Sequence, residues 1–379
     1  MIYLDNAATS WPKPELVYRE MINCMKSYGA NPGRSGHKMA MIASEKIYEC
    51  RENISQLFSI PNPLCISFTS NTTESLNMGI KGILKPGDHV ITTSMEHNSV
   101  LRPLKKLESL GVALSIAKAD AEGQVNIIEI LKHIKKNTQM IVVTHASNVT
   151  GTINPVNEIG KLARKYNLIY MVDAAQTAGI YPVDVEKMNV DILAFPGHKG
   201  LLGPQGTGGL YIREGLLLDT LKEGGTGSIS ESFYQPDFAP DRYESGTLNT
   251  PGIAGLNEGA KYILKTGITE IMRHEQELTK SLLEGLYSIK KVSVYGKQEL
   301  EQRVGVISIN IEGRDCVEVC NELDENYNIA SRAGLHCAYM AHQTIGTLHT
   351  GTIRLSIGHF NTRKDVNKVL KAVNQIASY

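Results

Sequence analysis

The 379-residue chain has no excess of charge of one sign, because 39 Lys and Arg residues balance 39 Asp and Glu residues. A basic surplus is typical of proteins that bind nucleic acid or anionic membranes, so its absence argues against both partners. No apolar run approaches the roughly eighteen residues of a membrane span. The N-terminal "MIYLDNAATSW" also lacks a basic segment followed by an apolar core. We therefore expect no signal peptide, a cytoplasmic location, and a small molecule or another protein as partner.

Cysteine is scarce and scattered. The six cysteines lie at positions 24, 50, 65, 316, 320 and 337, without a CxxC pair. This spacing argues against a disulfide framework and against a structural zinc site, and reduced thiols suit the expected compartment. Cys316 and Cys320 lie four residues apart on an expected helix, but no second pair of ligands accompanies them. We interpret both as packing residues and expect no metal.

Short apolar runs alternate with amphipathic stretches from residue 64 onward. Helical patterns occur near residues 73–84, 97–110, 126–136 and 155–166. The apolar runs are "LCISFT", "HVITTS", "VALSIA", "MIVVTH", "LIYMVD", "DILAFP" and "GGLYIR". This alternation predicts an α/β fold in which a mostly parallel, seven-stranded sheet is flanked by helices.

The remainder of the chain changes character twice. After "EGGTGSIS" it reads as a loop to about residue 252, and a long helical pattern then covers roughly 253–290. The C-terminal part contains the strand "VGVISINI", the helix "DCVEVCNELDENY", the strands "NIASR" and "TIRLSI", and the helix "RKDVNKVLKAVNQIAS". This order predicts a smaller α+β domain. We expect a large domain over 15–252, and a small domain formed by 1–14 together with 253–379.

Polar side chains follow several of the expected strands, where ligands gather in such a fold. Asn71, Thr72 and Thr73 precede a helical segment, whose N-terminus can bind a phosphate, although the same residue types are common caps. His97 follows another strand, where it could stack on a flat ligand, relay protons or be a polar loop residue. Asn148 lies at the same edge.

Two further strand ends carry the most specific chemistry. Asp173 ends the run "LIYMVD", with Gln176 close behind, and a buried aspartate needs a cation, a donor or a capping role. Lys199 follows the turn "FPGHKG", where apolar and glycine neighbours favour a nucleophilic amine. Pyridoxal 5′-phosphate needs a lysine for its Schiff base, an aspartate for its ring nitrogen and a phosphate cup. The residues together predict a site for this cofactor.

The chain resembles the class V, fold type I pyridoxal phosphate enzymes, and within them the cysteine desulfurase and selenocysteine lyase family. The resemblance extends from residue 3 almost to the C-terminus. The segments that carry it are "YLDNAAT", "TSNTTESLN", "MEHNS", "THASNVTG", "VDAAQ", "GHKGLLGPQGTGGLYI", "ESGTLNTPG", "SRAGLHCA" and "TIRLSIGHFNT". It implies a homodimer whose active sites lie at the subunit interface.

The resemblance also implies roles for particular residues. Lys199 would bind the cofactor and Asp173 its ring nitrogen, while His97 would stack on the ring and Gln176 would bind the ring hydroxyl. The phosphate would be held by Thr72, Thr73 and His198, joined by Thr247 from the second subunit. Asn148 and Arg354 match the residues that hold the substrate carboxylate.

The segment "SRAGLHCAYM" resembles the loop that presents a nucleophilic cysteine, which makes Cys337 the expected sulfur acceptor. Arg332 and His336 lie close to Cys337 in sequence, and positive charge favours a thiolate. The short stretch between Cys337 and Arg354 resembles the branch of the family that depends on an acceptor protein to remove its sulfur.

Two features depart from the family pattern. Pro196 stands where these enzymes commonly have a phosphate-binding serine, and His342 and His349 have no assigned role. The expected activity is a cysteine desulfurase that converts L-cysteine to L-alanine and forms a persulfide on Cys337. The alternatives are a selenocysteine lyase, another class V enzyme such as an aminotransferase, and a sulfur relay or scaffold protein without turnover.

Overall fold

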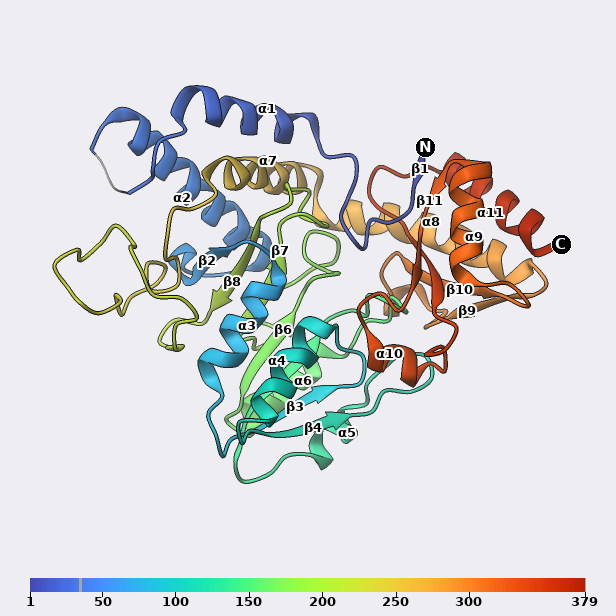
Figure 1. The fold of residues 1–379 in the computed structure, drawn as a ribbon, viewed down its shortest axis with the longest axis horizontal. Coiled ribbons are helices and arrows are strands. Elements are labelled where there is room, and N and C mark those ends of the chain that lie inside the picture. The colour runs from blue at the N-terminus through green and yellow to red at the C-terminus, as the bar shows by residue number, and fades with distance from the viewer. Residues whose placement is uncertain (34–35, 379) are drawn as a thin grey trace.

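The structure is a computed structural model that describes residues 1–33 and 36–378 (Figure 1). Its main sheet has seven strands in the order β2-β8-β7-β6-β5-β3-β4. The strands are β2 (Ile66–Thr69), β3 (His89–Thr93), β4 (Ala113–Ala117), β5 (Thr138–Thr144), β6 (Ile169–Asp173), β7 (Ile192–Pro196) and β8 (Gly208–Ile212). Only β8 runs against its neighbours in this sheet. The predicted mostly parallel, seven-stranded sheet is confirmed.

Helices cover both faces of this sheet. The predicted amphipathic segments form α3 (Thr72–Ile83), α4 (Asn98–Glu108), α5 (Ile127–Lys132) and α6 (Val156–Lys165). Alternate residues of one strand enter different cores: Ile141 and Val143 of β5 pack in one, and Met140 and Val142 in another. A strand buried on both faces must be apolar at every position, which explains the continuous apolar runs.

The sequence patterns did not predict the helices between residue 15 and the first strand of the large sheet. They are α1 (Glu15–Asn23), the π-helix η1 (Cys24–Tyr28) and α2 (Lys38–Phe58), followed by the 3₁₀ turn η2 (Pro63–Cys65). These elements pack against α7 (Thr250–Thr266) along one side of the large sheet (Figure 1). Apolar side chains of α2 and α7 enter the same core as β5 and β6.

The long helical pattern over 253–290 is two helices rather than one. α7 ends at Thr266 and α8 (Ile268–Ser288) begins two residues later. Gly267 between them has a φ of 90°, which a residue with a side chain adopts only with strain. Apolar periodicity continues across the break, because both helices bury one face, and so it did not reveal the break.

The C-terminal region forms the predicted smaller α+β unit. Its antiparallel sheet has the order β12-β13-β10-β9, and β1 (Ile2–Tyr3) pairs with β11 (Ile329–Ala330). The other elements are β9 (Val292–Tyr295), η3 (Leu300–Gln302), β10 (Val306–Ile311), α9 (Cys316–Tyr327), β12 (Arg332–Gly334), α10 (Tyr339–Thr344), β13 (Thr352–Ser356) and α11 (Arg363–Ser378). Sequence patterns missed β9.

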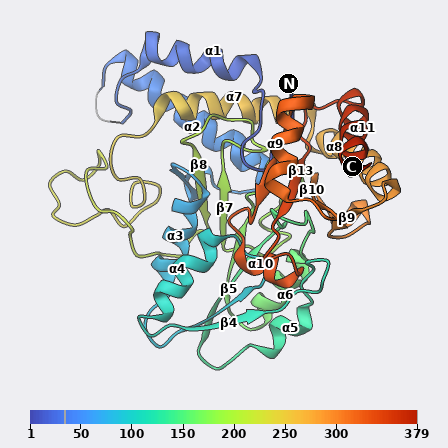
Figure 2. The same ribbon diagram turned by 45° about the vertical axis from the view of Figure 1, so that its right-hand side comes forward.

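These C-terminal elements lie beside one end of the large sheet (Figure 2). Leu4 of the N-terminal segment shares their core with Leu282 and Val373, whereas Ile263 of α7 belongs to the large core. The predicted division into 15–252 and 1–14 with 253–379 stays a prediction. Across the described residues, no helix is long and apolar enough to cross a membrane.

Candidate active site

The carboxyl ends of the parallel strands bring most of the predicted site residues together around one cavity of about 210 Å³. Nine predicted residues line it: Thr72, Thr73, His97, Asn148, Asp173, Gln176, His198, Lys199 and Arg354. Arg332 and His336 of the small unit line its other side. Cys337 adjoins this wall but does not line the cavity, and Thr247 lies elsewhere.

Lys199 follows β7 at the floor of the cavity. Removal from water, together with the nearby Arg354 cation, lowers the pKa of its ammonium to about 8. The Asp173 carboxylate acts in the opposite direction and raises this pKa. A lysine with this pKa has a usable fraction of neutral, nucleophilic amine near neutral pH.

Asp173 is the last residue of β6 and only 2% exposed. Burial raises the pKa of its carboxyl to about 6, although Oδ1 accepts a hydrogen bond from the Ala175 amide at 2.9 Å. The pKa is raised because burial disfavours the charged carboxylate. A protonated ring nitrogen beside the carboxylate would offset that cost. The position fits the predicted partner of a pyridine nitrogen.

Glu96, which the sequence analysis did not single out, is a second buried carboxyl, close enough to Asp173 for their charges to interact. It is fully buried, and its Oε1 accepts hydrogen bonds from Thr93 Oγ1 at 2.5 Å and from the Thr144 amide at 3.0 Å. Burial raises its pKa to about 8, and the charge of Asp173 raises it further. Glu96 is therefore mostly protonated at pH 7. Its place in "MEHNS", directly before His97, was the available signal.

The N-terminus of α3 forms one wall of the cavity. Asn71 caps this helix by accepting a hydrogen bond from the Glu74 amide at 3.0 Å. Thr72 is buried, and the hydroxyl groups of Thr73 and Ser99 are 2.8 Å apart. A side chain on Gly208 of β8 would come within 2.9 Å of the Asn71 backbone, so glycine permits this close approach. A helix N-terminus with hydroxyls suits a phosphate group.

His97 and His198 are both neutral imidazoles at pH 7. Burial lowers the pKa of each to about 4, and the charge of Lys199 contributes to both shifts. His97 caps α4, because its Nδ1 accepts from the Ser99 amide at 3.1 Å. The Nδ1 of His198 is buried without a hydrogen-bond partner among the described residues. That atom is free for a ligand, and its position supports the predicted phosphate contact.

Gln176 and Pro196 lie where the sequence placed them, at strand ends. Gln176 is buried and its side-chain nitrogen donates to the Ala7 carbonyl at 3.2 Å. Pro196 is the last residue of β7 and pairs with Gly208 of β8. Proline has no N–H for a sheet ladder, and the end of a strand tolerates its absence.

Arg354 on β13 is held by two groups of the protein. Nη2 lies 2.7 Å from Oδ1 of Asp5, and Nη1 donates to the Asn148 carbonyl at 3.2 Å. Its Nε is buried and has no partner in the described part of the chain. Asn148 donates its side-chain N–H to the His336 carbonyl at 2.7 Å. Asp5 belongs to the quoted segment "YLDNAAT", but nothing in the sequence showed that it meets Arg354.

Cys337 lies on a loop after β12, beside the cavity. His336 and Cys337 have φ values of 48° and 57°, the left-handed region that side chains rarely adopt. Arg332 Nη2 lies 3.9 Å from Cys337 Sγ, and the Asn98 amide donates to the Cys337 carbonyl at 2.8 Å. All six cysteines are described, and Cys337 is the exposed one. The loop presents a thiol to solvent beside a guanidinium.

The two histidines without an assigned role differ in exposure. His342 on α10 is buried, and its Nδ1 lies 2.7 Å from Thr347 Oγ1. Its ring is 5.6 Å from that of His336. His349 is exposed. Within the described residues, no group of three or more His, Cys, Asp and Glu side chains could hold a metal ion.

The family model for class-V aminotransferases matches residues 2–369. The chain belongs to the class-V aminotransferase family. The probable cysteine desulfurase of Methanothermobacter thermautotrophicus is 36% identical over 382 residues, which cover 99% of this chain and 94% of the relative. The family depends on pyridoxal 5′-phosphate, so the predicted cofactor is confirmed.

Two solved structures confirm the predicted fold type of this class-V family member. The apo cysteine desulfurase of Thermococcus onnurineus NA1 has a TM-score of 0.94 at 36% identity, covering 100% of this chain and 94% of that one. The Escherichia coli cysteine desulfurase CsdA, in an S-sulfonic acid form, has a TM-score of 0.90 at 27% identity, with 99% and 94% covered.

Proposed function

We propose that the chain is a cysteine desulfurase that converts L-cysteine to L-alanine and keeps the sulfur as a persulfide on Cys337. The observation that carries this proposal is the contact between Arg332 and Cys337. Arg332 lines the cavity that also contains Lys199 and Arg354, and its Nη2 lies 3.9 Å from the thiol. An exposed cysteine therefore stands beside a cavity with an amine and a carboxylate-binding group. Relatives named as cysteine desulfurases support this conclusion.

The cavity fits pyridoxal 5′-phosphate, which when bound supplies a ring that takes up negative charge from the substrate α-carbon. The orphaned Nδ1 of His198, the buried Asp173 and the amine of Lys199 are the groups that such a ligand requires. We assign Lys199 to bond it, Asp173 to its ring nitrogen, His97 to its ring face, Gln176 to its hydroxyl, and Thr72, Thr73 and His198 to its phosphate.

Lys199 Nζ is also the group that moves a proton. With a pKa of about 8, on the order of a tenth of this amine is neutral at pH 7 in the protein without cofactor. A neutral amine accepts the substrate α-proton as a general base. The Asp173 carboxylate would keep the ring nitrogen of the bound cofactor protonated, and a protonated ring withdraws electrons more strongly.

Arg354 would bind and orient the substrate carboxylate. Its Nε is a buried donor without a described partner, and Asp5 and the Asn148 carbonyl fix the plane of its guanidinium. A planar guanidinium with an unused N–H suits a carboxylate oxygen. Asn148 lies beside it and also holds the loop of Cys337 through the His336 carbonyl.

Cys337 would take the sulfur. The thiolate Sγ attacks the sulfur of the substrate, so an S–S bond forms while the C–S bond breaks. The electron pair of the C–S bond stays with carbon, which takes up a proton and leaves as alanine. The guanidinium of Arg332 lies 3.9 Å from the Cys337 sulfur atom.

The position of Thr247 supports a homodimer. Thr247 lies outside the cavity, and its Oγ1 is 3.5 Å from Asn31 Nδ2. The family resemblance implies that it contacts the phosphate of a neighbouring subunit. Phe233 and Tyr234 on the preceding loop are 103% and 86% exposed, and a second subunit would remove their apolar surface from water.

Two further proposals concern the surroundings of the protein. An acceptor protein would remove the sulfur, since Cys337 is exposed on a loop where a second thiol can reach it. A cytoplasmic location is supported by six free cysteines. The division into domains 15–252 and 1–14 with 253–379 is likewise a proposal. Two separate cores support a division, but α7 packs in the core of the large domain, which favours a boundary after α7.

One assay tests the proposed function. The purified holoprotein is given L-cysteine, L-selenocysteine and several ordinary amino acids, and alanine, sulfide and selenide are measured. We expect alanine from cysteine, with sulfide released when a reductant is present. Alanine from selenocysteine alone would favour the lyase, and transfer of amino groups from ordinary amino acids without alanine from either chalcogen substrate would favour an aminotransferase.

A further inference from the structure

The N-terminal segment contacts the turn that carries Lys199 through an unusual number of donors. The carbonyl of His198 accepts from the Ser10 amide at 3.1 Å and from Thr9 Oγ1 at 3.0 Å. It also accepts from Lys13 Nζ at 2.7 Å. A backbone carbonyl has two lone pairs and usually fewer partners, so this one is held from several directions.

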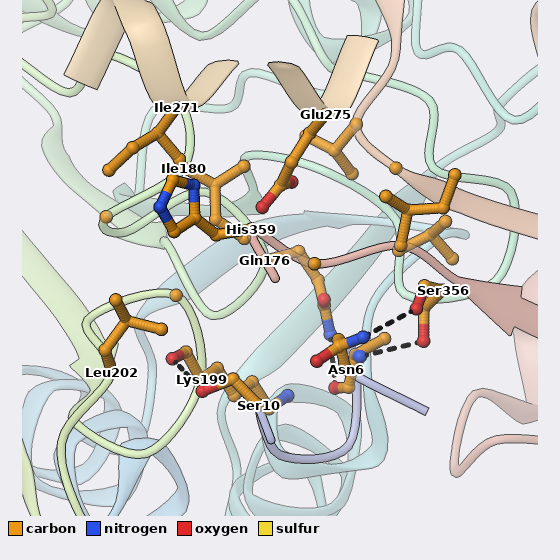
Figure 3. Close-up of a pocket in the computed structure, with 18 residues that line it drawn as sticks. Asn6, Ser10, Gln176, Ile180, Lys199, Leu202, Ile271, Glu275, Ser356 and His359 are labelled. Atoms are coloured by element: carbon orange, nitrogen blue, oxygen red, sulfur yellow. Dashed lines mark hydrogen bonds between the residues drawn. The ribbon is translucent and has the colours of Figure 1, made fainter. Parts of the chain in front are cut away.

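A second path leads from the same lysine to the next carbonyl. Lys13 Nζ donates to Ser10 Oγ at 2.6 Å. Ser10 Oγ donates its own hydrogen to the Lys199 carbonyl at 2.7 Å (Figure 3). Because the ammonium occupies the acceptor side of the hydroxyl, the hydroxyl hydrogen is directed toward Lys199. The carbonyls on both sides of the Lys199 Cα atom are thus connected to one ammonium.

Lys13 is a costly residue to place here. Burial lowers the pKa of its ammonium to about 7, and the structure shows no carboxylate bonded to it among the described residues. While Lys13 is protonated, its two bonds are charge-assisted, and such bonds are roughly twice as strong as neutral ones. Its charge also helps to keep His198 neutral.

We propose that Lys13, acting through Ser10, is a positioning residue that holds the peptide units of His198 and Lys199 and so keeps the Lys199 amine inside the cavity. The inference deepens the proposed function, since it concerns the residue that bonds the cofactor. Without Lys13, the turn would keep its internal bonds, from Leu202 N to the Lys199 carbonyl and from Gly203 N to the Gly197 carbonyl. The His198 carbonyl would also keep the bonds from the Ser10 amide and Thr9 Oγ1, but it would lose the cationic donor. The amine would then become more accessible to water.

The test compares Lys13→Met, which removes the donors at similar length, with Lys13→Arg, which retains a cation and its donors. Lys26→Met is the matched control, because Lys26 is an exposed lysine of the same N-terminal region. In the full chain freed of cofactor, labelling of Lys199 by an amine reagent is followed against pH. Arg354, Asp173, Arg332 and Asp5 are the charged groups that act on this amine, and all variants retain them.

We expect the labelling midpoint of Lys13→Met to rise from near 8 by about one pH unit or more, because water reaches the amine. Hydrogen exchange of residues 198–203 should become faster, and cofactor binding should weaken on the order of tenfold or more. Lys13→Arg should restore most of each property, and Lys26→Met should match the wild type. Unchanged labelling, exchange and cofactor affinity in Lys13→Met would overturn the proposal.

Ser10→Ala provides a second test, should Lys13→Met fail to fold. It removes the bond to the Lys199 carbonyl but leaves the bond from Lys13 to His198. Its labelling midpoint and exchange should move in the same direction by a smaller amount, and wild-type behaviour would contradict the proposed path. Labelling without cofactor involves no substrate, so its result is independent of whether the chain acts on cysteine.

Discussion

The two sides of the cavity are built differently. On the cofactor side, Asp173 ends β6, Lys199 follows β7, and Thr72 begins α3, so regular elements position each group. On the sulfur side, Cys337 lies in a loop with two consecutive left-handed residues, and it is exposed. The loop is joined to the large unit by hydrogen bonds from Asn148 and Asn98 to the carbonyls of His336 and Cys337. Ala338 also packs beside Met95 and Val149.

This difference corresponds to two tasks. Groups that hold a cofactor must stay within a fraction of an ångström of one geometry, and strand ends provide such rigidity. A sulfur carrier must approach the substrate and then a second molecule. Left-handed backbone at non-glycine residues costs roughly 1–3 kcal/mol each and is found at functional positions. The strained loop therefore lies on the side of the cavity where Cys337 would take sulfur from the substrate and pass it to a second molecule.

Replacement of Lys199 should have the largest effect, because it removes cofactor bonding on one side of the cavity and, with it, the chemistry that delivers sulfur to Cys337 on the other. Lys199→Ala removes the amine that bonds the cofactor and moves the proton, so alanine formation should fall on the order of 10³-fold or more. The measurement is alanine release together with the visible spectrum after cofactor addition. Lys26→Ala should behave as the wild type, and an active Lys199→Ala would remove the basis of the assigned mechanism.

Replacement of Cys337 should separate the two sides. Cys337→Ala should reduce sulfur release from cysteine on the order of 10²-fold or more, because no thiolate remains to accept the sulfur. The visible spectrum and the cofactor affinity should stay unchanged, since the cofactor side is intact. Selenocysteine turnover should persist if selenium leaves without this attack. Cys65→Ala is the control at a buried cysteine remote from the cavity, and full cysteine activity in Cys337→Ala would contradict the assigned role.

Asp173→Asn should weaken turnover but stabilise the protein without cofactor. The pKa of Asp173 is raised in the folded state to about 6, so folding disfavours its charge. Stability from this group is complete below the unfolded pKa near 4, declines as pH rises, and is lost above about pH 6. Two pKa units correspond to roughly 3 kcal/mol. Urea denaturation at pH 4 and pH 8 should show the variant more stable only at pH 8.

The structure indicates that the Asp173 carboxyl is buried and that its charge is therefore unfavourable. An equal difference in unfolding free energy between wild type and Asp173→Asn at both pH values would contradict this. The holoprotein provides the complementary result. There, kcat should fall on the order of 10²-fold, because the amide cannot hold a proton on the ring nitrogen.

The smallest effect distinguishes a helix cap from a ligand site. Asn71 caps α3 at the cavity and Asn126 caps α5 away from it, and each accepts a backbone N–H. Each substitution by alanine should cost about 1 kcal/mol of unfolding free energy. Only Asn71→Ala should also weaken cofactor binding, measured by titration with pyridoxal 5′-phosphate. Equal cofactor affinities in the two variants would show that the α3 N-terminus takes no part in binding.

Much of the cofactor side could be predicted from the sequence. Apolar runs at regular intervals indicated the parallel strands, and the carboxyl ends of such strands share one edge of the sheet. Asp173 and Lys199 follow two of these runs, so their convergence follows from topology alone. Cys337 could be identified only through a motif and a family resemblance, because its loop has no regular hydrophobic pattern.

Other features depend on contacts between distant parts of the chain. Asp5 meets Arg354, and Lys13 meets His198, across 349 and 185 residues. The segment "MEHNS" drew attention to the neighbourhood of Glu96, but its bond from the Thr144 amide joins residues 48 positions apart. Hydrophobic periodicity reports which face of an element is buried, but it does not report which polar group lies opposite another.

The sequence by itself determined the strands of the large sheet, the helices between its first five strands and the residues at the strand ends, because these follow from local periodicity. The family followed from the quoted segments. Only the tertiary structure decided which polar groups are paired, which are left without a partner, and how far each pKa moves. Those properties depend on distance and on removal from water, and both arise when the small unit and the N-terminal segment close over the edge of the large sheet.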